Sequence, residues 1–185
     1  MTALPIERPE PSRTAASARR TSSATAAGLG IVEHPADRLG RLAPHYDGLA
    51  MLEAIRDGEL PPPPIADLLG FEIRELARGE VSFAMVPTLQ QYNPIGMVHG
   101  GVAATLLDTV MGCAVHTLLP KGVGYSTLDI SVRYLRPITV DTRTVVATGK
   151  VVHHGRRTAT AEGRIVAAES GQLLATATST LIVVR

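Results

Sequence analysis

The sequence has little that would support disulfide cross-links, aromatic stacking or a strong electrostatic field. Its 185 residues include one cysteine, Cys113, so no disulfide can form within the chain, as a reducing compartment would allow. Aromatic residues make up only 3%, which gives no hint of an aryl-stacking wall around a ligand. Lysine and arginine total 18 against 17 acidic residues, a balance that provides no field for nucleic acid or an anionic membrane. A small molecule or another protein is therefore the expected partner.

Long hydrophobic runs are also missing. No run approaches the roughly 18 apolar residues of a membrane span. The first thirty residues lack the apolar stretch of a secretory signal. We therefore expect a cytoplasmic protein without a membrane partner.

The chain divides into three parts by composition. Residues 1–33 are rich in Ala, Ser, Thr, Pro and Arg, and they have too few large apolar side chains to offset the entropy of ordering, so they are expected to be a disordered tail. Residues 34–64 combine an N-terminal helix, expected from about residue 35 to 57, with a proline-rich spacer at Pro61–Pro64. Residues 65–185 form the expected folded domain.

Strands dominate this domain. The segments 71–76 and 81–86 flank a short turn and predict a hairpin, and residues 126–135 alternate as a half-buried strand. Three later segments, 142–152, 156–168 and 172–184, are rich in Val, Ile and Thr and predict an antiparallel meander. The middle one has a face of small residues, which indicates that something bulky packs against it.

One long helix is expected, from about residue 100 to 118. Its apolar stripe should pack on the sheet, which leaves Asp108 on the opposite side among small neighbours such as Gly101 and Thr105. A carboxylate in an apolar helix is costly unless it is paired, hydrogen-bonded or shifted in pKa. Two explanations stay open: an aspartate satisfied by nearby hydroxyls, or a functional carboxylate.

The glycine-rich loop before this helix favours a functional carboxylate. Gly96, Gly100 and Gly101 let backbone approach a ligand, and the first N–H groups of a helix have no intrahelical acceptor. Such donors can stabilise an oxyanion during acyl transfer. Asp108 lies about 12 Å further along the helix axis, too far to serve the same carbonyl carbon within one chain. An antiparallel helix of a second subunit would bring the two groups together.

The runs "NPIGMVHGG", "ATLLDTVMGCA" and "YSTLDISVRYLRPI" resemble the PaaI-type acyl-CoA thioesterases of the hotdog-fold superfamily, over roughly residues 65–185. The resemblance implies an α+β hotdog fold, in which a curved antiparallel β-sheet wraps a long central helix. It also implies homodimers or homotetramers with active sites at the dimer interface. The implied activity is hydrolysis of an acyl-CoA substrate to a free acid and coenzyme A.

The resemblance also implies residue roles. Asn93, His99 and Gly100 would position and polarise the thioester carbonyl. Asp108 would act as general base or nucleophile, and Ser126 would help to hold the attacking water. Strand alternation independently predicts that Ser126 faces the helix, because it shares parity with the apolar residues that follow it.

Substrate contacts are expected from two groups of residues. Gly101 and Thr105 lie on the small-residue face of the helix, where a ligand can approach. Basic residues near strand ends contact the nucleotide phosphates of coenzyme A in the resembled family, which implicates Arg133, Arg136 and Arg156. Each of these arginines could equally be a solvated surface cation.

Other functions remain as alternatives. A non-catalytic acyl-CoA or ligand-binding module on the same fold is possible, but it would have no need of Asp108. A hydratase signature fails because Gln91 and Gly96 stand where its Asp and His should be. The adjacent His153 and His154 lack further ligands at metal spacing, so we expect no metal and no cofactor beyond the coenzyme A of the substrate.

Two further side chains of the helix are expected to be structural. Cys113 has no evident base or cationic neighbour, so it is interpreted as a small core residue and not a nucleophile. His116 is expected to be hydrogen-bonded locally.

Overall fold

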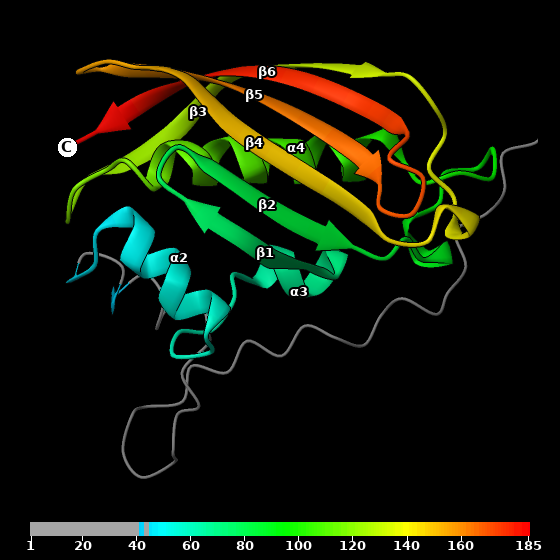
Figure 1. The fold of residues 1–185 in the computed structure, drawn as a ribbon, viewed down its shortest axis with the longest axis horizontal. Coiled ribbons are helices and arrows are strands. Elements are labelled where there is room, and N and C mark those ends of the chain that lie inside the picture. The colour runs from blue at the N-terminus through cyan, green and yellow to red at the C-terminus, as the bar shows by residue number, and fades with distance from the viewer. Residues whose placement is uncertain (1–40, 43–44) are drawn as a thin grey trace, which may run out of the picture. The chain divides into compact units, whose positions relative to one another are not determined.

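The computed structural model describes residues 41–42 and 45–185, and the expected disordered tail at 1–33 lies outside them. Figure 1 shows a six-stranded antiparallel sheet curved around one long helix. The elements are α2 (Gly48–Arg56), α3 (Pro64–Leu69), β1 (Phe71–Ala77), β2 (Glu80–Met85), α4 (Gly100–His116), β3 (Gly124–Tyr134), β4 (Val145–His154), β5 (Thr158–Ala167) and β6 (Leu173–Val184).

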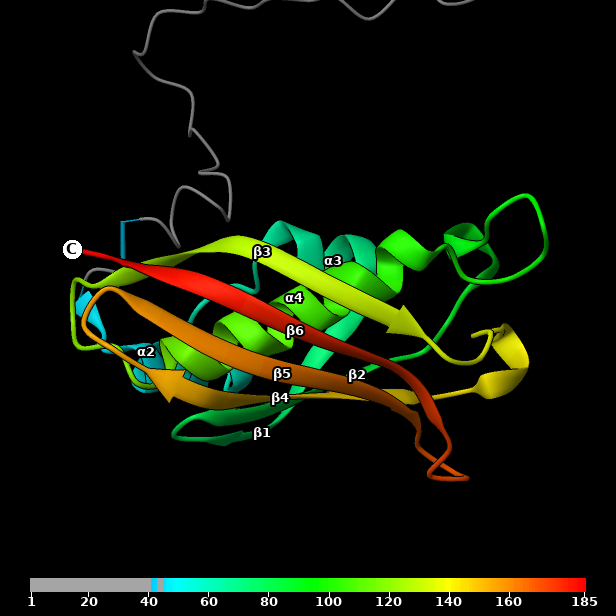
Figure 2. The ribbon, with the colours of Figure 1, turned by 90° about the horizontal axis from the view of Figure 1, so that it is seen from above.

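The strands follow the order β1-β2-β4-β5-β6-β3, and every neighbouring pair is antiparallel. The predicted hairpin and the predicted meander are both confirmed, as β1–β2 and β4–β5–β6. Strand β3 follows α4 in the chain yet joins the sheet beside β6, so β1 and β3 are the two edges. Figure 2 shows β3, β6, β5 and β4 side by side across α4. This is the α+β arrangement of a central helix wrapped by a curved sheet.

Helix α4 forms the centre of the core. Leu106, Leu107, Val110 and Met111 are fully buried against the strands. Two glycines allow this close approach: a Cβ at Gly149 would overlap the carbonyl of Val110, and a Cβ at Gly163 would lie 3.1 Å from Leu107 Cδ2. Helix α4 is therefore the bulky element that was expected to pack against the small-residue face of β5.

Strand β3 contains a β-bulge directly after Thr127, which shifts its register against β6. Before the bulge Tyr125 and Thr127 face α4, whereas after it Val132 and Tyr134 do so. The predicted uninterrupted alternation is therefore wrong at the beginning of the strand. As a consequence Ser126 is exposed and does not face the helix.

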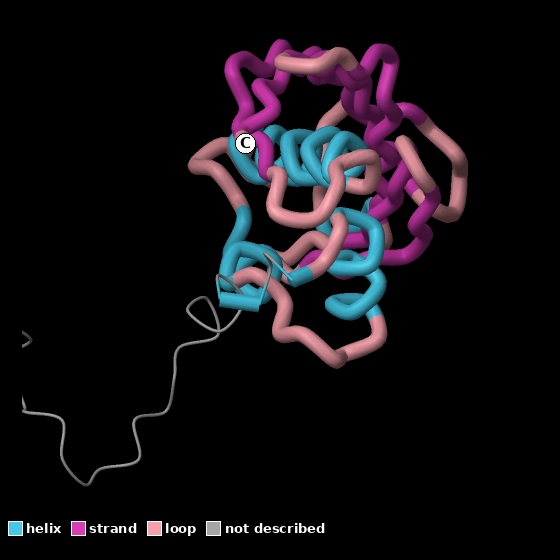
Figure 3. Tube along the Cα trace, turned by 90° about the vertical axis from the view of Figure 1, so that its left-hand side faces the viewer, coloured by secondary structure: helices cyan, strands magenta, loops and turns pink. Residues whose placement is uncertain are grey.

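The N-terminal segment packs onto this core and does not act only as a spacer. Helix α2 is capped by Asp47, whose side chain accepts a hydrogen bond from the Ala50 N–H at 2.9 Å. Pro64 opens α3, where its missing N–H costs nothing, so the predicted extended proline run ends one residue early. Leu52 and Ala66 are buried in the main core. Seen end-on to α4, the short helices lie on the side that the sheet leaves open (Figure 3).

The helix predicted from about residue 35 to 57 is observed in part. Its last section is α2, while residues 35–40 and 43–44 lie outside the described part of the chain. No helix among the described residues is both long and apolar enough to cross a membrane.

Candidate functional site

A loop stabilised by internal hydrogen bonds precedes α4. The Nε2 of Gln91 donates to the carbonyl of Leu69 at 2.7 Å, and the Gln91 carbonyl accepts from the His99 N–H at 2.8 Å. Gln91 is buried, and its side-chain oxygen also accepts from the Thr88 N–H at 3.0 Å. The residue that replaces the acid of a hydratase signature therefore has a structural role.

Asn93 shapes the same loop with one end of its side chain. Its Oδ1 accepts hydrogen bonds from the N–H groups of Ile95 at 3.1 Å and Met97 at 3.3 Å. No hydrogen bond from Nδ2 is present within the described part of the chain. The side-chain amide is therefore held by its oxygen and keeps its N–H donors for a ligand.

His99 is the N-cap of α4. Its Nδ1 accepts a hydrogen bond from the Gly101 N–H at 2.9 Å, and its carbonyl accepts from the Val102 N–H at 2.9 Å. Among residues 45–185 no acceptor is bonded to the Gly100 N–H, so this donor stays available at the positive end of the helix. The Gly101 N–H, by contrast, is already occupied by the cap.

Thr105, expected to touch substrate, uses its hydroxyl within the helix. Its Oγ1 donates to the carbonyl of Gly101 at 2.9 Å. A substrate could therefore meet its methyl group or a lone pair of its oxygen, but not a free hydroxyl proton.

Tyr134 completes the surroundings of Gly100, and the sequence analysis missed it as a site residue. Its hydroxyl donates to the Gly100 carbonyl at 2.9 Å, and a Cβ at Gly100 would lie 3.2 Å from its ring. The alternation of β3 placed Tyr134 on the inner face but could not show how far its ring reaches. Tyr134 fixes the first turn of α4 from the strand side.

A cavity of about 270 Å³ opens beside this helix end, and Asn93, Gly100, Tyr134 and Arg136 are among the residues that line it. Arg136 donates from Nη1 to the Leu173 carbonyl at 2.8 Å, which holds its guanidinium at the cavity wall. The structure thus brings together three of the predicted site residues: Asn93, Gly100 and Arg136. An anionic or carbonyl-bearing ligand would meet backbone N–H, amide and guanidinium donors here.

Asp108 lies two turns further along α4, on a partly exposed flank. Its Oδ1 accepts a hydrogen bond from the Thr127 hydroxyl at 2.9 Å. Thr127 therefore occupies the position that the sequence analysis gave to Ser126, because the bulge reverses which residues face the helix. The run "YSTLD" contains two hydroxyl side chains, Ser126 and Thr127. Uninterrupted alternation predicted that Ser126 faces the helix, whereas Thr127 does so.

Asp108 does not line the cavity beside Gly100. Eight residues of helix separate the two, about 12 Å along the axis. The chain therefore carries two separate candidate half-sites: a donor-rich helix end and a carboxylate held by Thr127.

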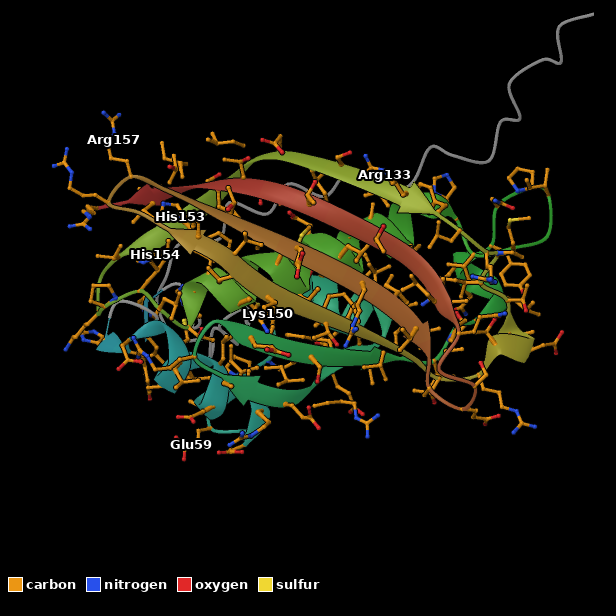
Figure 4. The ribbon with its side chains drawn as sticks, turned by 45° about the horizontal axis from the view of Figure 1, so that its top comes forward. Glu59, Arg133, Lys150, His153, His154 and Arg157 are labelled. Carbon is orange, nitrogen blue, oxygen red and sulfur yellow. The ribbon has the colours of Figure 1, made fainter. Side chains whose placement is uncertain are left out.

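The remaining predicted arginines lie away from both half-sites of their own chain. Arg133 is on the outer face of the sheet, where it lines a depression of about 430 Å³ together with Lys150 and Arg164. Figure 4 labels Arg133 on β3 and Lys150 on β4. Arg156 precedes β5 in an exposed turn. Thr158, two residues after Arg156, aligns across β6 with Ser126 of β3. Arg156 therefore lies near the end of β3 that is opposite Tyr134. Arg133 is thus remote from both half-sites of its own chain, and its expected contact with substrate stays a prediction.

Cys113, His116 and Tyr125 lie together near the C-terminal end of α4. Burial raises the pKa of the Cys113 thiol to about 12, which suits a core residue and not a nucleophile. Burial also raises the pKa of Tyr125 and lowers the pKa of His116. His116 packs against the Tyr125 ring, and its Nδ1 has no hydrogen-bond partner in the described structure, so the expected local satisfaction of this residue is wrong.

The described residues contain no group of His, Cys, Asp or Glu arranged to hold a metal ion. His153 and His154 end β4 as exposed side chains, at the end of the sheet where Figure 4 also shows Arg157.

Comparisons with known proteins identify the family and the fold. A family model described as the thioesterase superfamily matches residues 95–174, which include the last residues of the loop, α4 and β3. A protein of Halobacterium salinarum assigned as an esterase is 36% identical over 107 residues, which cover 55% of this chain and 69% of that protein.

The comparison with solved structures also finds a thioesterase-family protein. A thioesterase-family protein related to phenylacetic acid degradation, from Ralstonia eutropha, has a TM-score of 0.64 and 30% identity, with 71% of this chain and 98% of that chain covered. The E. coli PaaI protein from the phenylacetic acid degradation operon has a TM-score of 0.62 at 21% identity, with 82% and 97% covered. The second likeness supports the fold.

Proposed function

The chain belongs to the thioesterase superfamily as a PaaI-type hotdog protein, and we propose that it hydrolyses acyl-CoA thioesters at two sites shared across a homodimer. Hydrolysis of acyl thioesters as a class follows from the family. The observation that best supports the proposed mechanism is the pair of half-sites on α4: the free Gly100 N–H at its start and the Asp108–Thr127 hydrogen bond on its flank.

The chemistry needs both half-sites at one thioester. Water attacks the carbonyl carbon while Asp108 takes its proton, or the carboxylate attacks directly and water then opens the resulting anhydride. The Gly100 N–H and the helix dipole stabilise the oxyanion, and the Nδ2 of Asn93 donates to the same oxygen. Collapse of the tetrahedral intermediate breaks the C–S bond, and in the nucleophilic route this is the step that forms the anhydride. The departing thiolate takes up a proton to give coenzyme A, and the free acid is released directly or when water opens the anhydride.

A second copy of the chain brings the half-sites together. Strand β3 is an edge strand with an unpaired hydrogen-bonding row, and its side chains Leu128 and Ile130 are 57% and 36% exposed. Such an edge favours pairing with another strand. Antiparallel pairing of two β3 strands about a two-fold axis would direct Asp108 of each protomer toward the Gly100 end of the other. Two such dimers could form a homotetramer.

The same pairing would also position the predicted arginines relative to the two sites. Arg136 already lines the cavity beside Gly100, so it is the best-placed cation for the phosphates of coenzyme A. Arg156 lies at the far end of β3 from its own Gly100, and an antiparallel dimer would move it toward the partner's site. We place this activity in the cytoplasm, without a metal or a cofactor other than the coenzyme A of the substrate.

Thiol release from a panel of acyl-CoA thioesters tests the proposal. Wild type, Asp108→Asn and the exposed control Asp141→Asn are compared at equal folded concentration. We expect wild type to release thiol, Asp108→Asn to lose about 10²- to 10⁴-fold in kcat with binding retained, and Asp141→Asn to match wild type. If wild type binds the thioesters but cleaves none, the protein is a ligand-binding module and the proposal is wrong.

A further inference from the structure

A further cavity lies outside the two half-sites. It is a half-open cavity of about 680 Å³, bounded by α2, α3, the hairpin β1–β2 and one flank of α4. The inner lining is apolar and includes Leu52, Ile55, Ala66, Phe71 and Phe83. The charged lining residues Arg56, Asp67 and Glu72 are exposed, so they lie at the rim.

The cavity is adjacent to the catalytic flank of α4. Thr109 and Cys113 line it, and Thr109 directly follows Asp108. The Thr109 hydroxyl donates to the Thr105 carbonyl at 2.8 Å, so its proton is used inside the helix and its methyl group is left for contact. To reach this apolar space, an acyl group attached to a carbonyl at Asp108 would have to pass around the helix surface by about 100°, the turn from Asp108 to Thr109.

The size of the cavity distinguishes between acyl groups. At about 680 Å³ it is roughly four times the ~150 Å³ that holds one benzene ring in a protein interior. A single aromatic ring would leave most of it empty, whereas an extended chain of methylenes can fill it. The Phe71 and Phe83 rings are packed edge-to-face on each other, with centroids 5.9 Å apart, so the two rings do not form a parallel pair between which an aryl group would stack.

We propose that this cavity is the acyl-chain chamber of the enzyme, that it selects aliphatic chains of medium length, and that α2 and α3 set its depth. The proposal rests on the thioesterase function proposed above. The family match begins at residue 95, so the α2–α3 wall lies outside it. Ala66 on α3 and Ile55 on α2 are then residues that determine chain-length specificity.

A chain-length series tests the chamber. Values of kcat/KM are measured for butyryl-, octanoyl-, dodecanoyl- and phenylacetyl-CoA with wild type, Ala66→Leu, Ile55→Ala and Leu68→Phe. Leu68 is on the same helix as Ala66 but is 76% exposed and outside the lining, so its substitution is the matched control. Thermal unfolding confirms that each variant folds.

For wild type, kcat/KM is expected to rise from butyryl to octanoyl by up to about fourfold per methylene, and octanoyl should exceed phenylacetyl. Ala66→Leu should lower the values for octanoyl and dodecanoyl at least about tenfold while butyryl stays within about twofold. Ile55→Ala should shift the substrate preference toward dodecanoyl-CoA. This variant tests the proposal if Ala66→Leu does not fold. Leu68→Phe should leave the profile as in wild type.

The chamber is rejected if thioesters are hydrolysed without a rise in kcat/KM with chain length, or if Ala66→Leu and Ile55→Ala keep the wild-type profile. In that case the thioesterase function still stands. If no thioester is hydrolysed, the proposed function fails, and calorimetric binding of octanoate against butyrate to wild type and Ala66→Leu decides the chamber. Equal affinity for both acids, or no effect of the substitution, overturns it.

Discussion

The Thr127 hydroxyl donates a 2.9 Å hydrogen bond to Asp108, and this bond connects the edge strand β3 to the partly exposed flank of α4. A carboxylate that accepts a hydrogen bond from a hydroxyl at one oxygen is restrained in rotation and keeps lone pairs at the other oxygen. The bond forms only because a bulge after Thr127 changes the parity of the strand. Local backbone geometry thus selects which hydroxyl serves the carboxylate.

Thr127→Val should reduce kcat about 10- to 100-fold, since a hydrogen bond to a charged group contributes about 1.5–3 kcal/mol. Thr127→Ser keeps the hydroxyl and should recover most of the activity. Ser126→Ala, at the exposed neighbouring position, should change kcat by less than about twofold, within the range of surface substitutions. Steady-state kinetics with a single thioester measures all three variants. A larger loss for Ser126→Ala than for Thr127→Val would return the role to Ser126.

Gly100→Pro should remove the proposed oxyanion donor without removing the helix. Proline is tolerated at the first position of a helix, and the backbone of His99, with φ −58° and ψ 134°, suits a residue before proline. The expected loss in kcat is about 10²- to 10³-fold. Gly100→Ala is the control, because it adds the same Cβ beside Tyr134 but retains the N–H. Equal losses in both variants would point to crowding at Tyr134 and not to a lost donor.

Gly149→Ala should destabilise the fold, because the added Cβ overlaps the carbonyl of Val110 in α4. The expected decrease in the free energy of unfolding is about 1–3 kcal/mol or more. Gly124→Ala is the control, since a Cβ there meets nothing within 4 Å. Urea denaturation compares the two variants with wild type. A wild-type midpoint for Gly149→Ala would show that α4 is packed less closely against β4.

His116 should make stability depend on pH. Burial lowers the pKa of this imidazole below its ordinary value of 6.5, although Asp47 opposes the shift. Below pH 6.5 the unfolded chain therefore binds more protons than the folded chain, and the free energy of unfolding falls as the pH falls. His116→Phe removes this effect. The free energy of unfolding of wild type minus that of the variant should therefore become less positive, or more negative, from about pH 7.5 to 5.5. A pH-independent difference would contradict the assignment.

Much of the fold could be predicted from residue patterns. The turn signals and alternation predicted the β1–β2 hairpin, the β4–β5–β6 meander and a long helix from Gly100. One face of β5 consists mostly of Ala and Gly. This predicted that a bulky element packs closely against it, because such small side chains leave space above the strand. These features depend on local periodicity, which one sequence records directly.

The parts that could not be predicted depend on single-residue irregularities and on distant contacts. A bulge in β3 has no clear sequence signal, and it moved the inward position from Ser126 to Thr127. The hydrogen bond from Tyr134 to Gly100 joins residues 34 positions apart, and the start of α3 at Pro64 depends on packing against β1 and the core. Periodicity identifies faces but not the partners that meet across them.

The central claim is that each active site combines two chains, and mixed dimers test it most directly. Asp108→Asn and Gly100→Pro chains with different affinity tags are co-expressed, and the heterodimer is purified through both tags. Each mutant homodimer should be inactive, whereas the heterodimer should regain about half of the wild-type kcat per dimer, because one of its two sites is then intact. A folded, correctly mixed heterodimer that remains as inactive as the two parents would contradict the shared site.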